Sequence, residues 1–465
     1  MTSWVPDLRR HEGPRYMAIA EALASDAASG RLRPGTRLPT HRELADRLGV
    51  TVGTVTRGYA EAARRGLVSG EVGRGSFLRG PAPPFVAAPE AGAGELIDLA
   101  VNHPPPAAER ERQPELARTL DRLSRRRDLG TLLAYPPEGG APEHRAAGAA
   151  WLQRVGLAAG GEQVLVSSGS QHGMTAVFAG VLRPGDLVVT EALTYSGMKS
   201  LAGLLHLRLS GLAIDARGLR PDAFEAACRG GNVKALYCIP TLHNPTTRSM
   251  PEERRREIAT IARAHGVLLV EDDIYSPLLE SAPRPLSTYA PELSVYLTGT
   301  AKALAPGLRV GFILAPRPLL PRIAAAIRTT TWMAAPLMAE IAAAWIEDGT
   351  AERILRSRRR EIAARHQLAA ALLRGQRLES HPAAYHAWLS LPEPWRSQAF
   401  VDAARRRGVA VTPAAAFQVG RSPAPDAVRV CIGAARDREQ LEAALRVLAS
   451  LLEGPSETPG FTAGP

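Results

Sequence analysis

Short apolar runs alternate with amphipathic stretches over most of the chain, from residue 97 to about residue 452. Several of the runs have the length and composition of strands: QVLVSS, DLVVTE, KALYCIP, GVLLVEDD, SVYLTG and VGFILA. Most of them are separated by segments in which apolar residues recur at helical spacing. This alternation predicts an α/β domain built on a largely parallel sheet.

A different pattern fills the first part of the chain. The segment HRELADRLG (41–49) is apolar along one helical face and ends at Gly49, a typical helix stop. The segment TVGTVTRGYAEAARRG (51–66) begins with Thr51, a good N-cap, and again carries apolar residues at helical spacing. The sequence LVSGEVGRGSFLR (67–79) then fits two strands joined by a glycine-rich turn. Together these features predict a helix-turn-helix followed by a wing.

The composition divides these patterns into domains. The chain has 465 residues, and residues 1–80 hold 13 Arg against 8 Asp and Glu, a net charge of +5. The stretch that follows is rich in Pro, Ala and Gly and predicts a linker over residues 81–96. We therefore expect a winged helix over 1–80, a larger domain over 97–452 and a flexible tail over 453–465.

Charge and cysteine content narrow the class of protein. The formal net charge of the chain is +11, which allows a polyanionic partner. The three cysteines form no CxxC pair, so the sequence predicts neither a disulfide framework nor a metal site. The N-terminus lacks the apolar core of a signal peptide, and no uncharged apolar run is long enough to span a membrane. We expect a cytoplasmic protein.

Lysine is rare in this chain, since Lys199, Lys234 and Lys302 are the three among 57 basic residues. Lys302 follows an apolar run. In a cleft its amine could lose part of its hydration, acquire a lower pKa and form a Schiff base with an aldehyde. Arginine could not do this, because its guanidinium stays protonated. Nearby, Arg309 could bind a phosphate with two hydrogen bonds. An aldehyde and a phosphate on one ligand suggest pyridoxal 5′-phosphate (PLP).

Further polar residues lie where apolar runs end, which is where α/β sheets bind ligands. Ser170 and Gln171 open a predicted helix whose N-terminus favours a phosphate. Tyr195 could stack on a pyridine ring, and Asn244 could donate to the phenolate oxygen of that ring. Asp272 could pair with the protonated pyridine nitrogen, which keeps the ring an electron sink.

Two more residues complete this set. Tyr275, shortly after Asp272, could also reach the phenolate oxygen. Arg429 lies in the strand-like run AVRVCIG and suits a substrate carboxylate. Any one of these residues alone is more simply a packing residue, a helix cap, a turn residue or an ion-pair partner. The prediction of a PLP site therefore rests on their combination and order.

The N-terminal segment resembles the GntR-type winged helix through GRLRPGTRLPTHRELADRLGV, TVTRGYAEAARRGLV and GRGSF. The resemblance implies that double-stranded promoter DNA is a partner, and that these residues lie on the DNA side: Arg42, Thr51, Thr54, Thr56, Arg57 and Arg74. The family often has an arginine directly after the threonine that begins the recognition helix. Here that position is Val52, followed by Gly53, so the readout of DNA sequence must differ.

Residues 97–452 resemble the fold type I aminotransferases, and the two joined domains resemble the MocR-type regulators. The resemblance implies a role for each candidate residue: Lys302 as the internal aldimine with PLP, Asp272 on the pyridine nitrogen, Asn244 with Tyr275 on the phenolate oxygen, Tyr195 on the ring face, Ser170, Gln171 and Arg309 on the phosphate, and Arg429 on an amino-acid carboxylate. Lys302, Asp272 and Tyr195 would then be the residues closest to any chemistry.

The same resemblance implies a homodimer in which Tyr135, from the segment YPPEGGAPEHRAAGAAWL, reaches the phosphate from the partner subunit. It also implies a Ser or Thr on the phosphate, three residues before the lysine. This chain has Gly299 there, with Thr298 and Thr300 on either side, and either threonine could substitute. The residue directly before the lysine is Ala301, where the family commonly has Ser.

These observations favour a transcription regulator that senses a ligand through bound PLP. An amino acid or another amine could replace Lys302 in an external aldimine, or PLP itself could be the effector. The alternative is a catalytically active aminotransferase with an accessory DNA-binding module, because the residues needed for transamination are present. A third alternative is a binding module without cofactor.

Overall fold

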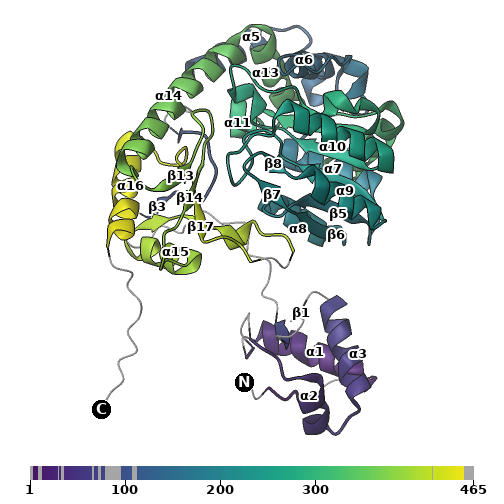
Figure 1. Ribbon diagram of the computed structural model, residues 1–465. Coiled ribbons are helices and arrows are strands. Elements are labelled where there is room, and N and C mark those ends of the chain that lie inside the picture. Colours follow the sequence, from purple (N-terminus) through teal and green to yellow (C-terminus); the bar gives the residue numbers. More distant parts are fainter. Residues whose placement is uncertain are drawn as a thin grey trace. The chain divides into compact units, whose positions relative to one another are not determined.

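The computed structural model describes most of the chain: residues 4–8, 13–29, 31–32, 36–64, 67–71, 75–78, 96–106, 113–420 and 423–454. The chain forms two compact units, Met1–Glu90 and Ala91–Pro465. Figure 1 draws the first in purple and the second from blue through green to yellow. Within the described ranges, no helix is long and apolar enough to cross a membrane.

The N-terminal unit consists of three helices and a hairpin: α1 (Arg15–Ala28), α2 (His41–Leu48), α3 (Val52–Arg64), β1 (Val68–Glu71) and β2 (Gly75–Leu78). The two strands pair antiparallel. The two predicted helices and the two predicted strands are thus confirmed.

Local sequence signals set the ends of α2. The Thr40 hydroxyl accepts a hydrogen bond from the Glu43 backbone N–H, and the Glu43 carboxylate accepts one from the Thr40 backbone N–H. This reciprocal cap satisfies two backbone donors that a helix start leaves unpaired. Gly49 ends the helix in left-handed backbone, with φ at 61°.

The core of the N-terminal unit lies between α1 and α3. Ile19 and Leu23 of α1 are fully buried against Val55 and Tyr59 of α3. The helices can approach closely because Gly58 has no side chain: a Cβ placed there would lie 3.0 Å from the Ile19 Cβ atom. Val52, Gly53 and Thr56 of the same helix are exposed.

The large unit is built on a seven-stranded sheet. In pairing order its strands are β4 (Val164–Ser167), β12 (Gly311–Leu314), β11 (Ser294–Gly299), β10 (Leu268–Asp272), β9 (Val233–Cys238), β5 (Leu187–Glu191) and β6 (Arg208–Leu212). All neighbours pair parallel except β12, which is antiparallel to both β11 and β4. The predicted largely parallel sheet is confirmed, and the six apolar runs from QVLVSS to VGFILA each form one of its strands.

Both faces of this sheet are buried, which is why its strands are almost continuously apolar. Val270 and Tyr237 pack into one core, whereas Leu269 and Leu236 pack into a second core. The surrounding elements are α6 (Pro142–Gln153), α7 (Ser170–Val181), α8 (Ser196–Leu204), α9 (Pro221–Arg229), α10 (Glu252–His265), α12 (Leu320–Thr331), α13 (Pro336–Glu347) and the small hairpin β7 (Ile214–Asp215) and β8 (Gly218–Leu219).

A second, antiparallel sheet lies in the C-terminal part: β13 (Arg377–Glu379), β14 (Ala387–Ser390), β17 (Ala427–Val430) and β16 (Thr412–Pro413). The long helix α14 (Thr350–Leu372) leads to this part, where α15 (Ser397–Arg406) and α16 (Arg438–Glu453) pack (Figure 1). The strand β3 (Ile97–Asp98) pairs with β15 (Val409–Ala410). The segment that follows the predicted linker is therefore tied to the C-terminal part.

Candidate functional site

Lys302 lies at the edge of the large sheet where the parallel strands end. It belongs to α11 (Thr300–Ala303), the short helix that directly follows β11. Burial, together with the positive charge of the nearby Arg429 guanidinium, lowers the pKa of the Lys302 amine to about 8, against an opposing effect of Cys431. Lys302 Nζ donates a hydrogen bond to the Asn102 carbonyl oxygen. An amine with this pKa is partly neutral near pH 7 and can act as a nucleophile.

Asp272 ends β10 at the same edge and keeps one oxygen unpaired. Its Oδ2 atom accepts a hydrogen bond of 2.7 Å from the Tyr237 hydroxyl of β9. Among the described residues its buried Oδ1 atom has no hydrogen-bond partner. Burial raises the pKa of this carboxyl to about 6, against the Tyr237 hydrogen bond, which lowers it. A cationic N–H donor would satisfy Oδ1 and bring the pKa back down.

Arg429 connects the C-terminal sheet to the large sheet. From β17 it donates to Asn244 Oδ1 over 2.8 Å and to the Ala100 carbonyl oxygen over 2.6 Å. Its guanidinium carbon lies 4.6 Å from the centre of the Phe417 ring. The side chain is buried, and within the described ranges its Nε atom has no partner. Arg429 is thus a held, desolvated cation, which suits a carboxylate ligand.

Asn102 joins Tyr275 to the C-terminal part. Its Nδ2 atom donates to the Tyr275 hydroxyl over 2.8 Å and lies 3.3 Å from His386 Nδ1. His386 Nε2 lies 3.1 Å from the His243 carbonyl oxygen, so Nε2 carries the proton and Nδ1 accepts. Burial holds the pKa of His386 well below its usual range, whereas burial raises the pKa of the Tyr275 hydroxyl. Both groups are therefore neutral at pH 7.

Three glycines open a cradle at the N-terminus of α7, where backbone N–H groups face outward. Gly169 precedes the helix with φ at 88°, and a Cβ there would lie 2.7 Å from Arg309 Nη2. A Cβ at Gly311 would lie 2.8 Å from the Ser170 backbone N, and one at Gly299 would lie 3.4 Å from it. The exposed Arg309 guanidinium therefore lies close to this N-terminus and forms a site for an anion.

The hydroxyl missing at Gly299 is not replaced in an obvious way. The Thr300 hydroxyl is buried and donates to the Val310 carbonyl oxygen over 3.1 Å. The Thr298 hydroxyl is also buried and has no partner in the described part of the chain. The choice between the two threonines as a phosphate contact stays a prediction.

Tyr195 and Gln171 lie together near the cradle. The Tyr195 hydroxyl donates to Gln171 Oε1 over 3.0 Å. Burial, with a smaller contribution from the Asp272 carboxylate, raises the pKa of Tyr195 to about 12, while Arg429 and Arg309 oppose this. The mutual electrostatic effects of these groups indicate that the sheet edge gathers them into one site.

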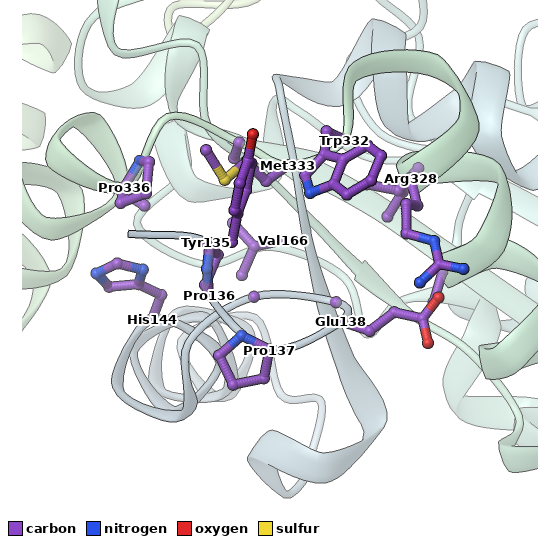
Figure 2. Close-up of a pocket in the computed structure, with 16 residues that line it drawn as sticks. Tyr135, Pro136, Pro137, Glu138, His144, Val166, Arg328, Trp332, Met333 and Pro336 are labelled. Atoms are coloured by element: carbon purple, nitrogen blue, oxygen red, sulfur yellow. The ribbon is translucent and has the colours of Figure 1, made fainter. Parts of the chain in front are cut away.

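Tyr135 lines a different feature, a cavity of about 240 Å³. Its side chain is 74% exposed, and its ring centre lies 5.5 Å from that of Trp332. Figure 2 shows the two rings side by side over this cavity, with Pro137 and Glu138 nearby. The predicted role of Tyr135 requires a second subunit and stays a prediction.

The predicted DNA-side residues lie on α2 and around α3, but several have partners within the unit. The Thr51 hydroxyl accepts from the Thr54 backbone N–H over 3.2 Å, and the two hydroxyls lie 2.9 Å apart. The Thr56 hydroxyl donates to the Val52 carbonyl oxygen. The Arg57 guanidinium stacks on the ring of a tyrosine of α1 at 4.3 Å. Arg42 is exposed, as the prediction requires; Arg74 lies outside the described residues.

Comparison with known sequences assigns both units. Residues 94–448 match the family described as aminotransferase class I and II, and residues 15–78 match the bacterial regulatory proteins of the gntR family. The uncharacterized HTH-type transcriptional regulator YdeF of Bacillus subtilis is 32% identical over 97% of this chain and 97% of its own length. The vitamin B6 salvage pathway transcriptional repressor PtsJ of Salmonella typhimurium is 25% identical over 92% of this chain and 96% of its own.

The chain belongs to the MocR-type transcriptional regulators.

Solved aminotransferase structures resemble the large unit of this MocR-type regulator. A Pyrococcus horikoshii kynurenine aminotransferase, with 23% identity, superposes with a TM-score of 0.70 over 77% of this chain and 91% of its own. An α-aminoadipate aminotransferase of Thermus thermophilus, with 25% identity and bound N-(5′-phosphopyridoxyl)-L-leucine, has a TM-score of 0.69 over 77% and 92%. The large unit therefore has the aminotransferase fold, and PLP is its cofactor.

The residues of this MocR-type regulator fit PLP. The unpaired Asp272 Oδ1 atom suits the ring N–H, and the glycines at the N-terminus of α7 let the Arg309 guanidinium lie beside that helix end, where a phosphate could bind. The weakly basic Lys302 amine suits an aldehyde. The individual contacts between these residues and the cofactor stay predictions.

Sequence reasoning missed Tyr237, Asn102 and His386. A signal existed for Tyr237: it is a hydroxyl in an otherwise apolar strand run, and a buried tyrosine hydroxyl usually finds a partner. No spacing or motif marks Asn102 or His386, because their partners lie far away in the sequence.

Proposed function

We propose that this MocR-type regulator binds double-stranded promoter DNA through its N-terminal unit, and that ligands of the large unit change the DNA affinity. One observation carries the proposal. In the segment after the predicted linker, the Ala100 carbonyl oxygen accepts a hydrogen bond from Arg429, and the Asn102 carbonyl oxygen accepts one from Lys302. These two side chains are the donors that a ligand would need. Because promoter DNA is the partner, we place the protein in the cytoplasm.

A ligand would compete with this segment. The carboxylate of an amino acid would attract Arg429, and an aldehyde would engage Lys302. Each would take a hydrogen bond away from the backbone of residues 100–102. A ligand shifts an equilibrium only by the difference between its affinities for the two states. Here the difference in affinity would arise at residues 100–102, which follow the predicted linker in the sequence.

When bound, PLP supplies an electrophilic aldehyde and a ring that withdraws electrons. In our proposal this chain's residues hold it: Asp272 accepts from the ring nitrogen, while Arg309 and the N-terminus of α7 bind the phosphate. Asn244 and Tyr275 face the phenolate oxygen, and Arg429 receives the carboxylate of an amino compound.

The test is a titration of cofactor-free protein on fluorescent promoter DNA, first with PLP and then with a panel of amino acids. A change in affinity with PLP alone would identify PLP as the effector. A change that needs an amino acid would identify an amine effector, and Arg429→Ala should then abolish the response while leaving the cofactor absorbance in place. Arg446→Ala, an exposed arginine on α16, is the matched control. DNA affinity that none of these ligands changes would contradict the proposal.

We also propose that the regulator is a homodimer. Two exposed aromatic side chains, Tyr135 and Trp332, line the cavity. Exposed leucines lie on nearby segments of the chain: Leu116, Leu120, Leu129, Leu133 and Leu337. The segments are neighbours, since both α5 (Gln113–Ser124) and residues 129–133 pack against α13. Apolar surface gathered in this way indicates a protein interface. A second copy would cover it and bring Tyr135 toward the neighbouring PLP site.

One observation favours catalysis as a second candidate function. The pKa of Lys302 lies near 8, so the amine could also move a proton at neutral pH. Steady-state release of keto acid from amino acids, measured with and without Lys302→Ala, tests this function. Turnover without specific promoter binding would replace the regulator proposal.

A further inference from the structure

One apolar side chain is exposed at the start of the recognition helix. Val52 is the first residue of α3 and is 44% exposed, although the later apolar residues Val55 and Tyr59 are buried in the core. Beside it, Gly53 presents no side chain, and a Cβ there would meet nothing nearer than the Thr51 hydroxyl at 3.8 Å. The valine methyl groups are therefore open to a partner, beside a position that has no side chain.

The polar side chains around Val52 have contacts within the N-terminal unit. The Thr51 hydroxyl caps the helix at Thr54, and the Thr56 hydroxyl donates to the Val52 carbonyl oxygen and lies 3.0 Å from His41 Nδ1. Arg57 is stacked on Tyr16. These contacts hold the polar groups in place but leave them spare hydrogen-bonding capacity. Val52 is the side chain of the first turn that can make only an apolar contact.

Double-stranded DNA offers one apolar group in its major groove, the 5-methyl group of thymine. The net charge of +5 over residues 1–80 attracts the phosphate backbone and brings α3 to the groove. We propose that Val52 selects thymine by contact with this methyl group, so that each half-site contains a thymine opposite the start of α3. The inference deepens the proposed function, because it presupposes that α3 enters the major groove of promoter DNA.

The experiment removes only the methyl group. Full-length PLP-bound protein first selects tight-binding duplexes from a random pool. Each thymine of the selected duplex is then replaced by deoxyuridine, and affinities are measured by fluorescence anisotropy. We expect one replacement per half-site to weaken binding about four-fold, the factor expected for one lost methyl contact. Val52→Ala should bind the thymine and uracil duplexes equally well.

Val5→Ala is the matched control, since Val5 is 46% exposed in the same unit. This variant should leave the ratio of the affinities for the thymine and uracil duplexes unchanged. Thermal unfolding checks that Val52→Ala remains folded, as expected for an exposed position. Uracil duplexes that bind as tightly as thymine duplexes would overturn the inference, as would an unchanged ratio in Val52→Ala, while DNA binding itself would stand. A pool that yields no preferred duplex would overturn the proposed function and this inference together.

Discussion

At the residue scale, the site depends on how burial changes ordinary ionisable groups. Lys302 loses hydration beside Arg429, and its amine becomes less basic. Asp272 loses hydration too, and its carboxyl becomes less acidic. Both shifts move the pKa values toward neutral pH, where the groups can exchange protons and the amine can attack an aldehyde.

Lys302→Ala should abolish the visible absorbance that PLP acquires when its aldehyde joins a protein lysine. The reason is chemical, since alanine has no amine. The matched control is Lys199→Ala: Lys199 is also partly buried, but it donates to the Ala416 carbonyl oxygen and should not affect the band. Absorbance spectra of both variants after PLP addition provide the measurement. A band that persists in Lys302→Ala would show that another lysine holds the cofactor.

The rate of PLP uptake should depend on pH through Lys302. Only the neutral amine attacks an aldehyde, and its fraction grows as the pH rises through the pKa. Because that pKa is lowered to about 8, the rate should rise up to about pH 8 and level off above it. Stopped-flow absorbance of cofactor-free protein mixed with PLP measures the profile. A rate that still climbs beyond pH 10 would indicate an ordinary, solvated lysine.

At the element scale, two glycines of α3 differ in what surrounds them. Gly58 faces α1, and a Cβ there would lie 3.0 Å from Ile19 and 3.1 Å from the Tyr16 carbonyl oxygen. Gly53 faces open space, and its nearest contact would be at 3.8 Å. The same substitution should therefore have opposite effects at the two positions.

Gly58→Ala should destabilise the N-terminal unit by about 1–3 kcal/mol, because the added methyl group forces α1 and α3 apart. Gly53→Ala should be neutral or stabilising by up to about 1 kcal/mol, because alanine favours helix. Differential scanning calorimetry of the full chain measures both variants, and the PLP absorbance of the large unit serves as an internal control. Equal stabilities would mean that the helices do not pack as closely as the structure has them.

At the scale of the whole molecule, the apolar surface around Tyr135 predicts a dimer. Leu133 is 91% exposed within this surface, whereas Leu204 is 70% exposed on α8. An exposed leucine within a larger apolar surface indicates a partner that covers it, whereas a single exposed leucine is ordinary.

Leu133→Asp should shift the protein toward monomer, because a carboxylate would be buried against apolar atoms in the interface. Leu204→Asp, which also introduces a carboxylate at an exposed leucine, should leave the mass unchanged. Sedimentation velocity of both variants measures the difference. If Leu133→Asp has the mass of the wild type, this surface is not the dimer interface.

Much of the fold was predictable because its signals are local. Thr40 and Gly49 bound α2 through caps made within a few residues. Six of the seven strands of the large sheet are apolar on both faces, so each of these six forms a recognisable run. β6 was not predicted, since its sequence RLSGL is partly polar and it pairs with a single neighbour at the sheet edge.

The sequence by itself determined the identity of the chemical groups: the rare lysine, the acid at a strand end, the arginines, and a valine at the start of α3. The tertiary structure decided what those groups touch. Arg429 meets Ala100 across 329 residues, and Asn102 meets His386 across 284. Tyr237 reaches Asp272 only because β9 and β10 are neighbours in the sheet. Such contacts follow from strand order and burial, which no local pattern encodes, whereas side-chain chemistry is written directly in each residue.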